Sequence, residues 1–138
     1  MTVEERKELL RTWVNLIIEN DYDFHLVFQV CSTRLFESVE LAAYAQELYN
    51  ETGLPNAIAS LPPYYERPST SSDQFNQMMS WFRPVVDAAP DLPFWYYHLP
   101  EENGVTLNMY EFVYYAWNGN DQGTSLPELK GTKYVMKE

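Results

Sequence analysis

The sequence has little of several features that mark common classes of protein. Cys31 is the only cysteine among 138 residues, so an internal disulfide is excluded, which fits a reducing compartment. The chain has nine Lys and Arg residues and twenty Asp and Glu residues, and the basic residues are scattered along it. A formal net charge of −11 would repel a phosphate backbone. We therefore expect no nucleic-acid partner.

Long apolar runs and metal-ligand clusters are also missing. No stretch approaches the ~20 apolar residues that cross a bilayer, and the first ten residues, MTVEERKELL, lack the apolar centre of a secretory signal. We expect no membrane partner and a cytoplasmic location. His25 and His98 are the only histidines and have no metal-ligand cluster around them. We accordingly expect no metal and no cofactor.

What the chain does have is material for a packed core. Hydrophobic residues make up 46% of it and aromatic residues 16%, which suits a single domain over residues 1–138. Short apolar, β-rich segments recur along the chain. We expect four strands at these segments: His25–Cys31, Asn56–Leu61, Pro93–Tyr97 and Leu126–Lys130.

Helical periodicity occupies the intervening segments. A capping box of Thr2 and Glu5 opens the first helix. A second helix is expected from Leu35 to a stop at Gly53. The expected third helix is capped by Ser71 and Gln74 and kinked at Pro84, and a fourth is expected over residues 110–117.

This alternation predicts an α/β fold, because parallel strands need a long, usually helical, crossover between them. The predicted strands start roughly every thirty residues, and eight such units would make the ~250 residues of a (β/α)8 barrel. We expect about four βα units, the central part of a TIM barrel. A small doubly wound domain is the alternative, although no Gly-rich phosphate-binding turn is present.

Chemistry in parallel α/β folds is carried at the carboxyl ends of the strands. Those ends carry the segments Cys31-Ser32-Thr33, Pro63-Tyr64-Tyr65, Tyr97-His98 and Lys130 to Thr132. Lys130, at the end of an apolar strand, would be desolvated, which favours the neutral amine that attacks a carbonyl. A strand-terminal lysine that reaches into solvent is the ordinary alternative.

The other candidates also have structural alternatives. Tyr97 could be one of many packing aromatics, since the chain has eleven tyrosines. His98 could be a hydrogen-bonded structural histidine. Cys31 lacks a partner that would activate a thiol, and we expect it to pack. Acidic pairs such as Glu101-Glu102 are expected to be solvated.

Five segments together resemble a known family. They are TVEERKELLRTWV, ESVELAAYAQEL, LPPYYERP, DAAPDLPFWYYHLPEENGV and ELKGT. In this order they resemble the animal N-acetylneuraminate lyases, within the pyruvate-dependent class I aldolases that include dihydrodipicolinate synthase. The aromatic run before His98-Leu99-Pro100 is the most specific segment. The resemblance implies that the first strands, with a Gly-Thr-Thr loop, and the strands after the lysine strand are missing.

The same resemblance implies an activity and site roles. Lys130 matches the lysine that forms a Schiff base with the keto carbon of sialic acid, and Tyr97 matches the tyrosine that relays protons. Cleavage would release N-acetylmannosamine and pyruvate. Thr132 matches a substrate-binding position beside the sugar. Tyr65 matches a position that, in some members, projects a tyrosine into the substrate site of a neighbouring subunit. A homotetramer acting on a small-molecule substrate in sialic acid catabolism is implied.

Two other functions are compatible with the residues. Another pyruvate-dependent aldolase would share the imine chemistry but use a different acceptor. A half-barrel without catalysis would act only in assembly through its unpaired strand edges. A covalent pyruvate adduct distinguishes the enzymes from the assembly protein.

Overall fold

The computed structural model describes residues 1–62, 70–99 and 107–134. The helices are α1 (Val3–Glu19), α2 (Leu35–Thr52), α3 (Ser71–Ala88) and α5 (Met109–Asn118). The strands are β1 (Val27–Gln29), β2 (Ala57–Ser60), β3 (Phe94–His98) and β4 (Leu129–Tyr134). They alternate along the chain as the sequence predicted.

The strands form one parallel sheet in the order β1-β2-β3-β4. Each strand therefore pairs with the next one along the chain through a helical crossover. The predicted parallel α/β class is confirmed. Regular pairing has a single irregularity in the described part of the sheet, a register shift between Phe94 and Trp95 where β3 meets β4.

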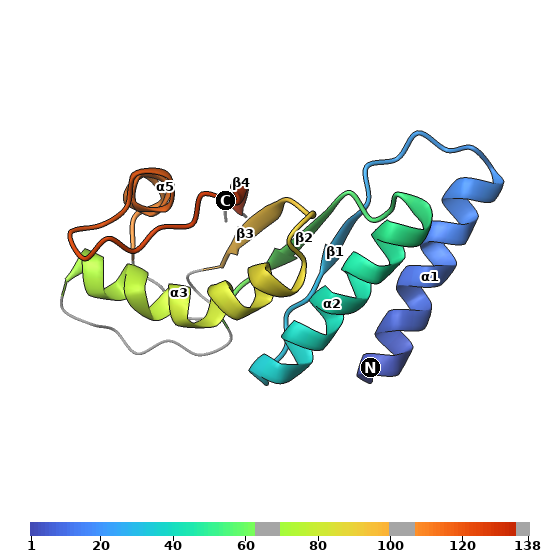
Figure 1. The fold of residues 1–138 in the computed structure, drawn as a ribbon, viewed down its shortest axis with the longest axis horizontal. Helices are drawn as coiled ribbons and strands as arrows, with labels where there is room; N and C mark the ends of the chain where they lie inside the picture. The colour runs from blue at the N-terminus through green and yellow to red at the C-terminus, as the bar shows by residue number, and fades with distance from the viewer. Residues whose placement is uncertain (63–69, 100–106, 135–138) are drawn as a thin grey trace.

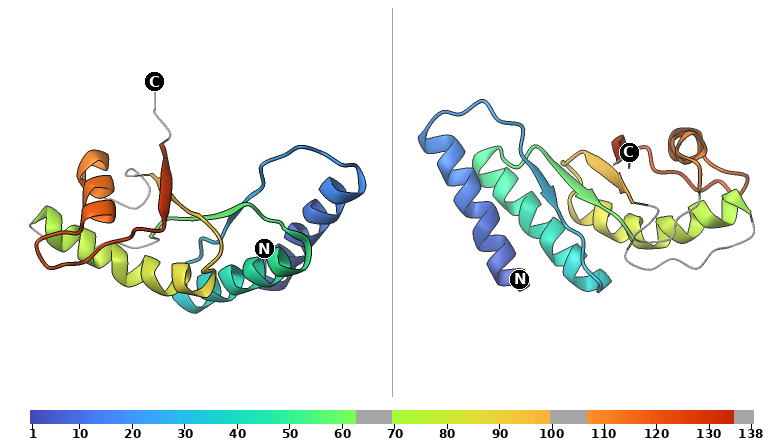
Figure 2. Two further views of the ribbon diagram at one scale, coloured as in Figure 1. Left: turned by 45° about the horizontal axis from the view of Figure 1, so that its top comes forward. Right: turned by 180° about the vertical axis from the view of Figure 1, so that it is seen from behind.

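All helices of the described chain lie around one side of this sheet (Figures 1 and 2). Neighbouring helices pack in chain order, α1 on α2, α2 on α3 and α3 on α5. The other side of the sheet carries no helix in the described residues. Two environments result, a covered face beneath the helices and an open face opposite them.

The covered face is built largely from aromatic side chains. The ring centroid of Phe82 in α3 lies 5.0 Å from that of Phe94 and 5.6 Å from that of Tyr96, both in β3. Phe112 of α5 lies 4.5 Å from Tyr96. All four of these side chains are at most 1% exposed. Because full burial of a large apolar side chain contributes about 1.5–3 kcal/mol, this cluster is the main reason why α3 and α5 stay on the sheet.

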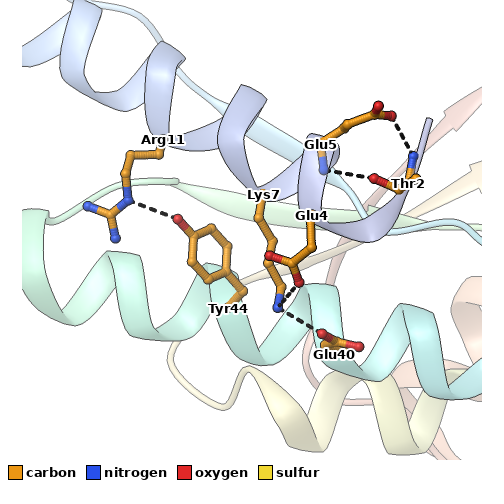
Figure 3. Close-up of polar contacts among 7 residues, drawn as sticks. All are labelled: Thr2, Glu4, Glu5, Lys7, Arg11, Glu40 and Tyr44. Atoms are coloured by element: carbon orange, nitrogen blue, oxygen red, sulfur yellow. Dashed lines mark hydrogen bonds and ion pairs between the residues drawn. The ribbon is translucent and has the colours of Figure 1, made fainter.

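Helix α1 begins with the predicted capping box. Thr2 Oγ1 accepts a hydrogen bond from the Glu5 backbone N–H at 3.1 Å, and Glu5 Oε2 accepts one from the Thr2 N–H at 2.7 Å (Figure 3). The box satisfies two backbone donors that a helix start leaves without partners.

Charged and aromatic groups join α1 to α2 (Figure 3). Lys7 Nζ lies 2.8 Å from Glu40 Oε1, and Arg11 Nε donates to the Tyr44 hydroxyl at 3.0 Å. The carboxylate of Glu40 raises the pKa of Lys7 above its usual value. These exposed contacts fix the relative register of the two helices more than they add to stability.

One predicted helix boundary differs from the structure, and another agrees with it. The third helix is capped by Thr70, whose hydroxyl accepts from the Asp73 N–H at 3.1 Å, so the predicted Ser71 cap is wrong by one residue. The predicted end of α2 is confirmed, since Gly53 has a φ of 82° that other residues rarely adopt.

The fourth strand is displaced from its predicted position. Leu126 to Lys130 was expected, but β4 runs from Leu129 to Tyr134. Gly131 does not end the strand, because its missing side chain makes room for Trp95 on β3, as described below. Lys130 is consequently the second residue of β4 rather than its last.

In the part of the chain that the structure describes, no helix combines the length and the apolar character needed to cross a membrane.

Candidate functional site

A shallow groove of about 450 Å³ lies on the open face of the sheet. Every strand contributes to its lining, which consists of His25, Val27, Gln29, Ala59, Trp95, Tyr97 and Thr132. Polar and aromatic groups of this kind, gathered on a parallel sheet, are what a small-molecule site requires.

One row of residues across the sheet forms the floor of the groove. Gln29 of β1 is paired with Ala59 of β2, Ala59 with Trp95 of β3, and Trp95 with Gly131 of β4. A Cβ built on Gly131 would lie 2.6 Å from Trp95 Cζ3, far inside van der Waals contact. Small residues on both sides of Trp95 therefore allow its indole to lie across the sheet.

Tyr97 stands one pleat beyond this floor, towards the carboxyl end of β3. Its neighbours Tyr96 and His98 are 1% and 6% exposed on the covered face, whereas Tyr97 is only half-buried and lines the groove. Side chains along a strand alternate between its two faces. Tyr97 is the penultimate residue of β3, one residue before the end of the strand, and His98 is separated from it by this alternation.

His98 belongs to the core and not to the groove. Its Nδ1 lies 2.8 Å from the Tyr96 hydroxyl, and the two rings make an edge contact at 5.4 Å. Burial lowers the pKa of His98 below its usual value, because a low-dielectric surrounding disfavours the imidazolium. Of the two alternatives that the sequence left for His98, the structure has the hydrogen-bonded structural histidine.

Lys130 does not have the strand-end position that the sequence suggested. It is the second residue of β4, at the register shift, and its side chain is exposed. The role that the resemblance implies for Lys130 stays a prediction.

A second lysine occupies the position that Lys130 was expected to have. The Cα of Lys133 is paired with Tyr97, and that of Tyr134 with His98, at the carboxyl end of the described sheet. The sequence signal for this was Thr132 and Tyr134, both good strand formers, which continue the strand past Gly131.

Thr132 lies between the two lysines and lines the groove, as expected for a residue close to substrate. The remaining predicted residues are placed less fully. Tyr65, together with Tyr64 and the Glu101-Glu102 pair, lies outside the described residues. Cys31 is partly buried, and burial raises the pKa of its thiol. A raised pKa favours the unreactive thiol, in agreement with the packing role expected for Cys31.

Arg6 of α1 holds the carboxyl end of β1 in place. Its guanidinium donates to the carbonyl oxygens of Cys31 at 2.6 Å and Gln29 at 2.5 Å. Carbonyls just past the end of a strand have lost ladder partners, so a planar multi-donor group is well suited to satisfy them. The Gln29 side of the groove is thereby fixed to the helical layer.

A second, more apolar groove of about 560 Å³ lies between α1 and β1. Exposed side chains along it include Leu9, Trp13, Phe24 and Val27. It carries few groups able to do chemistry, so we regard the open face of the sheet as the candidate site. Within the described ranges no three His, Cys, Asp or Glu side chains are grouped as metal ligands.

Comparisons with known proteins agree with this architecture. Residues 1–120 match the dihydrodipicolinate synthetase family. Similar curated proteins include N-acetylneuraminate lyase of Mus musculus, 33% identical over 98% of this chain, and N-acetylneuraminate lyase A of Xenopus laevis, 28% identical over 97%. The chain spans only 37% and 38%, respectively, of the length of these two relatives.

A solved structure shows the same arrangement of elements. The sialic acid aldolase of Ruminococcus gnavus, as a catalytic lysine mutant, superimposes with a TM-score of 0.73 at 25% identity, covering 99% of this chain and 38% of that one. The four βα units described above are therefore part of a TIM barrel, as the spacing of the strands predicted. In such a barrel the open face is the interior and the helix-covered face is the outer layer.

Proposed function

Because the chain belongs to the dihydrodipicolinate synthetase family, we propose that it supplies the imine-forming half of an N-acetylneuraminate lyase site. The observation that carries this proposal is the parallel pairing of β3, which carries Tyr97, with β4, which carries Lys130, beside the open-face groove that Tyr97 and Thr132 line. A primary amine and a phenol in adjacent strands are the two groups that imine chemistry requires.

The lysine amine would attack the keto carbon of the sugar acid, and loss of water from the carbinolamine would give a protonated imine. Tyr97 would accept the proton of the C4 hydroxyl, and the C3–C4 bonding electrons would move to the imine nitrogen. N-acetylmannosamine would leave as an aldehyde, and an enamine of pyruvate would remain. Protonation of that enamine at C3 and addition of water would release pyruvate and regenerate the amine.

Two lysines are candidates for the nucleophile. Lys130 is the residue that the sequence resemblance implies, and Lys133 lies three residues further along β4, where its Cα is paired with Tyr97. At about 3.3 Å per strand residue, the two Cα atoms are separated by roughly 10 Å along β4. Only one of them can be the nucleophile, because it must act with Tyr97 on the same few atoms of one substrate. We propose Lys130 as the nucleophile, with Lys133 as the alternative that the test must exclude.

The sugar end of the substrate would lie near Thr132, whose hydroxyl can donate or accept a hydrogen bond. The relatives named N-acetylneuraminate lyase support sialic acid as the substrate. We also propose the homotetramer that the sequence resemblance implies, in which Tyr65 would reach the substrate site of a neighbouring subunit. No cofactor enters any step of this mechanism.

The proposal is tested by product analysis. The chain is incubated with N-acetylneuraminate, and pyruvate and N-acetylmannosamine are measured separately. Equal amounts of the two products, lost in Tyr97→Phe, are expected. Trapping of pyruvate with borohydride but no cleavage of N-acetylneuraminate would instead indicate a pyruvate-dependent aldolase with another acceptor. Absence of both from a folded chain would indicate a role in assembly alone.

A further inference from the structure

A buried hydrogen-bonded pair lies directly behind Tyr97. Tyr96 and His98 flank Tyr97 in β3 and point to the covered face, where the Tyr96 hydroxyl is 2.8 Å from His98 Nδ1. Both side chains are almost completely buried. The mechanism above uses neither of them, so their polar atoms need another explanation.

Packing alone does not require these polar atoms. The Tyr96 ring packs against Phe82 of α3 and Phe112 of α5, at 5.6 and 4.5 Å, and a phenylalanine would fill the same space. Placing a phenol and an imidazole in such a core is costly unless they are hydrogen-bonded. The hydrogen bond between them offsets that cost, and it links two positions that are separated only by Tyr97.

The backbone consequence follows from strand geometry. Side chains at i and i+2 lie on the same face, and a bond between them restrains the pleat at residue i+1. Position 98 is the last residue of β3, beyond which the described strand pairing ends. The backbone is otherwise freest to move at the end of a strand. The restraint therefore acts on Tyr97, next to that end.

We infer that the Tyr96–His98 pair is a positioning device that holds the phenol of Tyr97 in register with the lysine of β4. The pair touches no reacting atom and acts only through Tyr97. This inference rests on the proposed function for its catalytic consequence, whereas the placement of Tyr97 can be measured without any activity. The lowered pKa of His98 agrees with it, because a neutral imidazole is the form able to accept the phenol proton.

The first test measures placement. Tyrosine is labelled with ¹³C at Cζ, and the Tyr97 signal is assigned by its loss in Tyr97→Phe. We expect Tyr96→Phe and His98→Leu to shift and broaden the Tyr97 signal, and His98→Asn, whose amide can accept the phenol proton, to restore it in part. Phe75→Leu is the control, since Phe75 is a buried core aromatic that makes an edge contact with Phe112 and a tilted contact with Tyr115. An unmoved Tyr97 signal in Tyr96→Phe would overturn the inference.

The second test measures catalysis in two stages. Borohydride trapping of pyruvate reports imine formation, and exchange of the pyruvate methyl hydrogens with deuterium from solvent reports the later proton transfer. Tyr96→Phe should slow exchange relative to trapping by about tenfold. This factor lies between the effect expected from losing one hydrogen bond and the effect expected from displacing a reacting group by about 1 Å.

A merely structural role predicts a different result. Loss of folded protein would lower trapping and exchange together, as expected for Phe75→Leu under partly denaturing conditions. Equal loss of both in Tyr96→Phe would overturn the inference. If the unmutated chain traps no pyruvate, the proposed function fails, and the labelled-tyrosine measurement alone decides whether the pair positions Tyr97.

Discussion

Neighbouring residues of β3 meet opposite surroundings. Phe94, Tyr96 and His98 are at most 6% exposed beneath α3 and α5, whereas Trp95 and Tyr97 are half-buried on the open face. Residues of the covered face are surrounded by aromatic rings, and those of the open face line a groove with Gln29 and Thr132. Within one strand, stability and chemistry are thus assigned to alternate residues, and each can be altered separately.

The largest difference between the faces should be in stability. Phe94→Ala removes a fully buried ring from the core and should lower the free energy of unfolding by about 3–5 kcal/mol. Val27→Ala, at a position 40% exposed on the open side of β1, should change it by less than about 1 kcal/mol. Urea titrations of both variants make the comparison. Similar losses would mean that the two faces are not energetically distinct.

The floor of the groove is the place where the open face also affects stability. Gly131→Ala puts a methyl group against the Trp95 indole, where a Cβ would lie 2.6 Å from Cζ3, and should cost about 1–3 kcal/mol. Trp95→Leu removes the clash and should reduce that cost. A double-mutant cycle by thermal unfolding measures this coupling. Strictly additive effects would contradict the contact.

The adjacent tyrosines should lose unequal amounts of stability when the hydroxyl is removed. Tyr96→Phe loses a buried hydrogen bond and should cost about 1 kcal/mol of stability. Tyr97→Phe lies on the open face, where water can replace lost contacts, and should cost less. Because the same atom is removed at both positions, chemical denaturation of the two variants compares their surroundings directly. A larger stability loss for Tyr97→Phe would reverse the assignment of the faces.

The smallest effect concerns an ion pair at the margin of the covered face. Arg83 Nη1 lies 2.8 Å from Glu128 Oε1, and this hydrogen bond lowers the pKa of Glu128 below its usual value of 4.5. The resulting stability is present above about pH 4.5 and is lost as the pH falls through the lower folded-state pKa. Since both side chains are more than one-third exposed, we expect only about 0.5 kcal/mol.

Glu128→Gln provides the control for that prediction. Unfolding free energies of the two proteins, measured from pH 6 to pH 3, should converge at the acidic end. A difference that persists unchanged at pH 3 would show that the carboxylate charge is not the cause.

Much of the arrangement was predictable from the sequence, because alternation and helix caps are local signals. The run FWYYH already indicates two faces, and Gly53 already marks a helix end. The lysine position was not predictable in the same way. Gly131 resembles a strand terminator, and only the Trp95 ring on the neighbouring strand explains why a glycine lies inside β4. The register shift beside Lys130 is likewise a property of two strands together.

The Tyr96–His98 bond illustrates the same limit from the covered side. Strand alternation places residues 96 and 98 on one face, but it cannot say whether their polar atoms meet. That depends on the rings of Phe82 and Phe112, which come from two other helices. Pairwise contacts between distant segments are what the sequence patterns leave undetermined.

The most direct test of the account is to locate the covalent adduct. The purified chain is incubated with pyruvate, reduced with borohydride and digested, and the modified lysine is identified by peptide mass spectrometry, with Lys130→Ala and Lys133→Ala in parallel. The account predicts a label on Lys130 that survives in Lys133→Ala and disappears in Lys130→Ala. A label confined to Lys133, or no label on a chain shown to be folded, would contradict it.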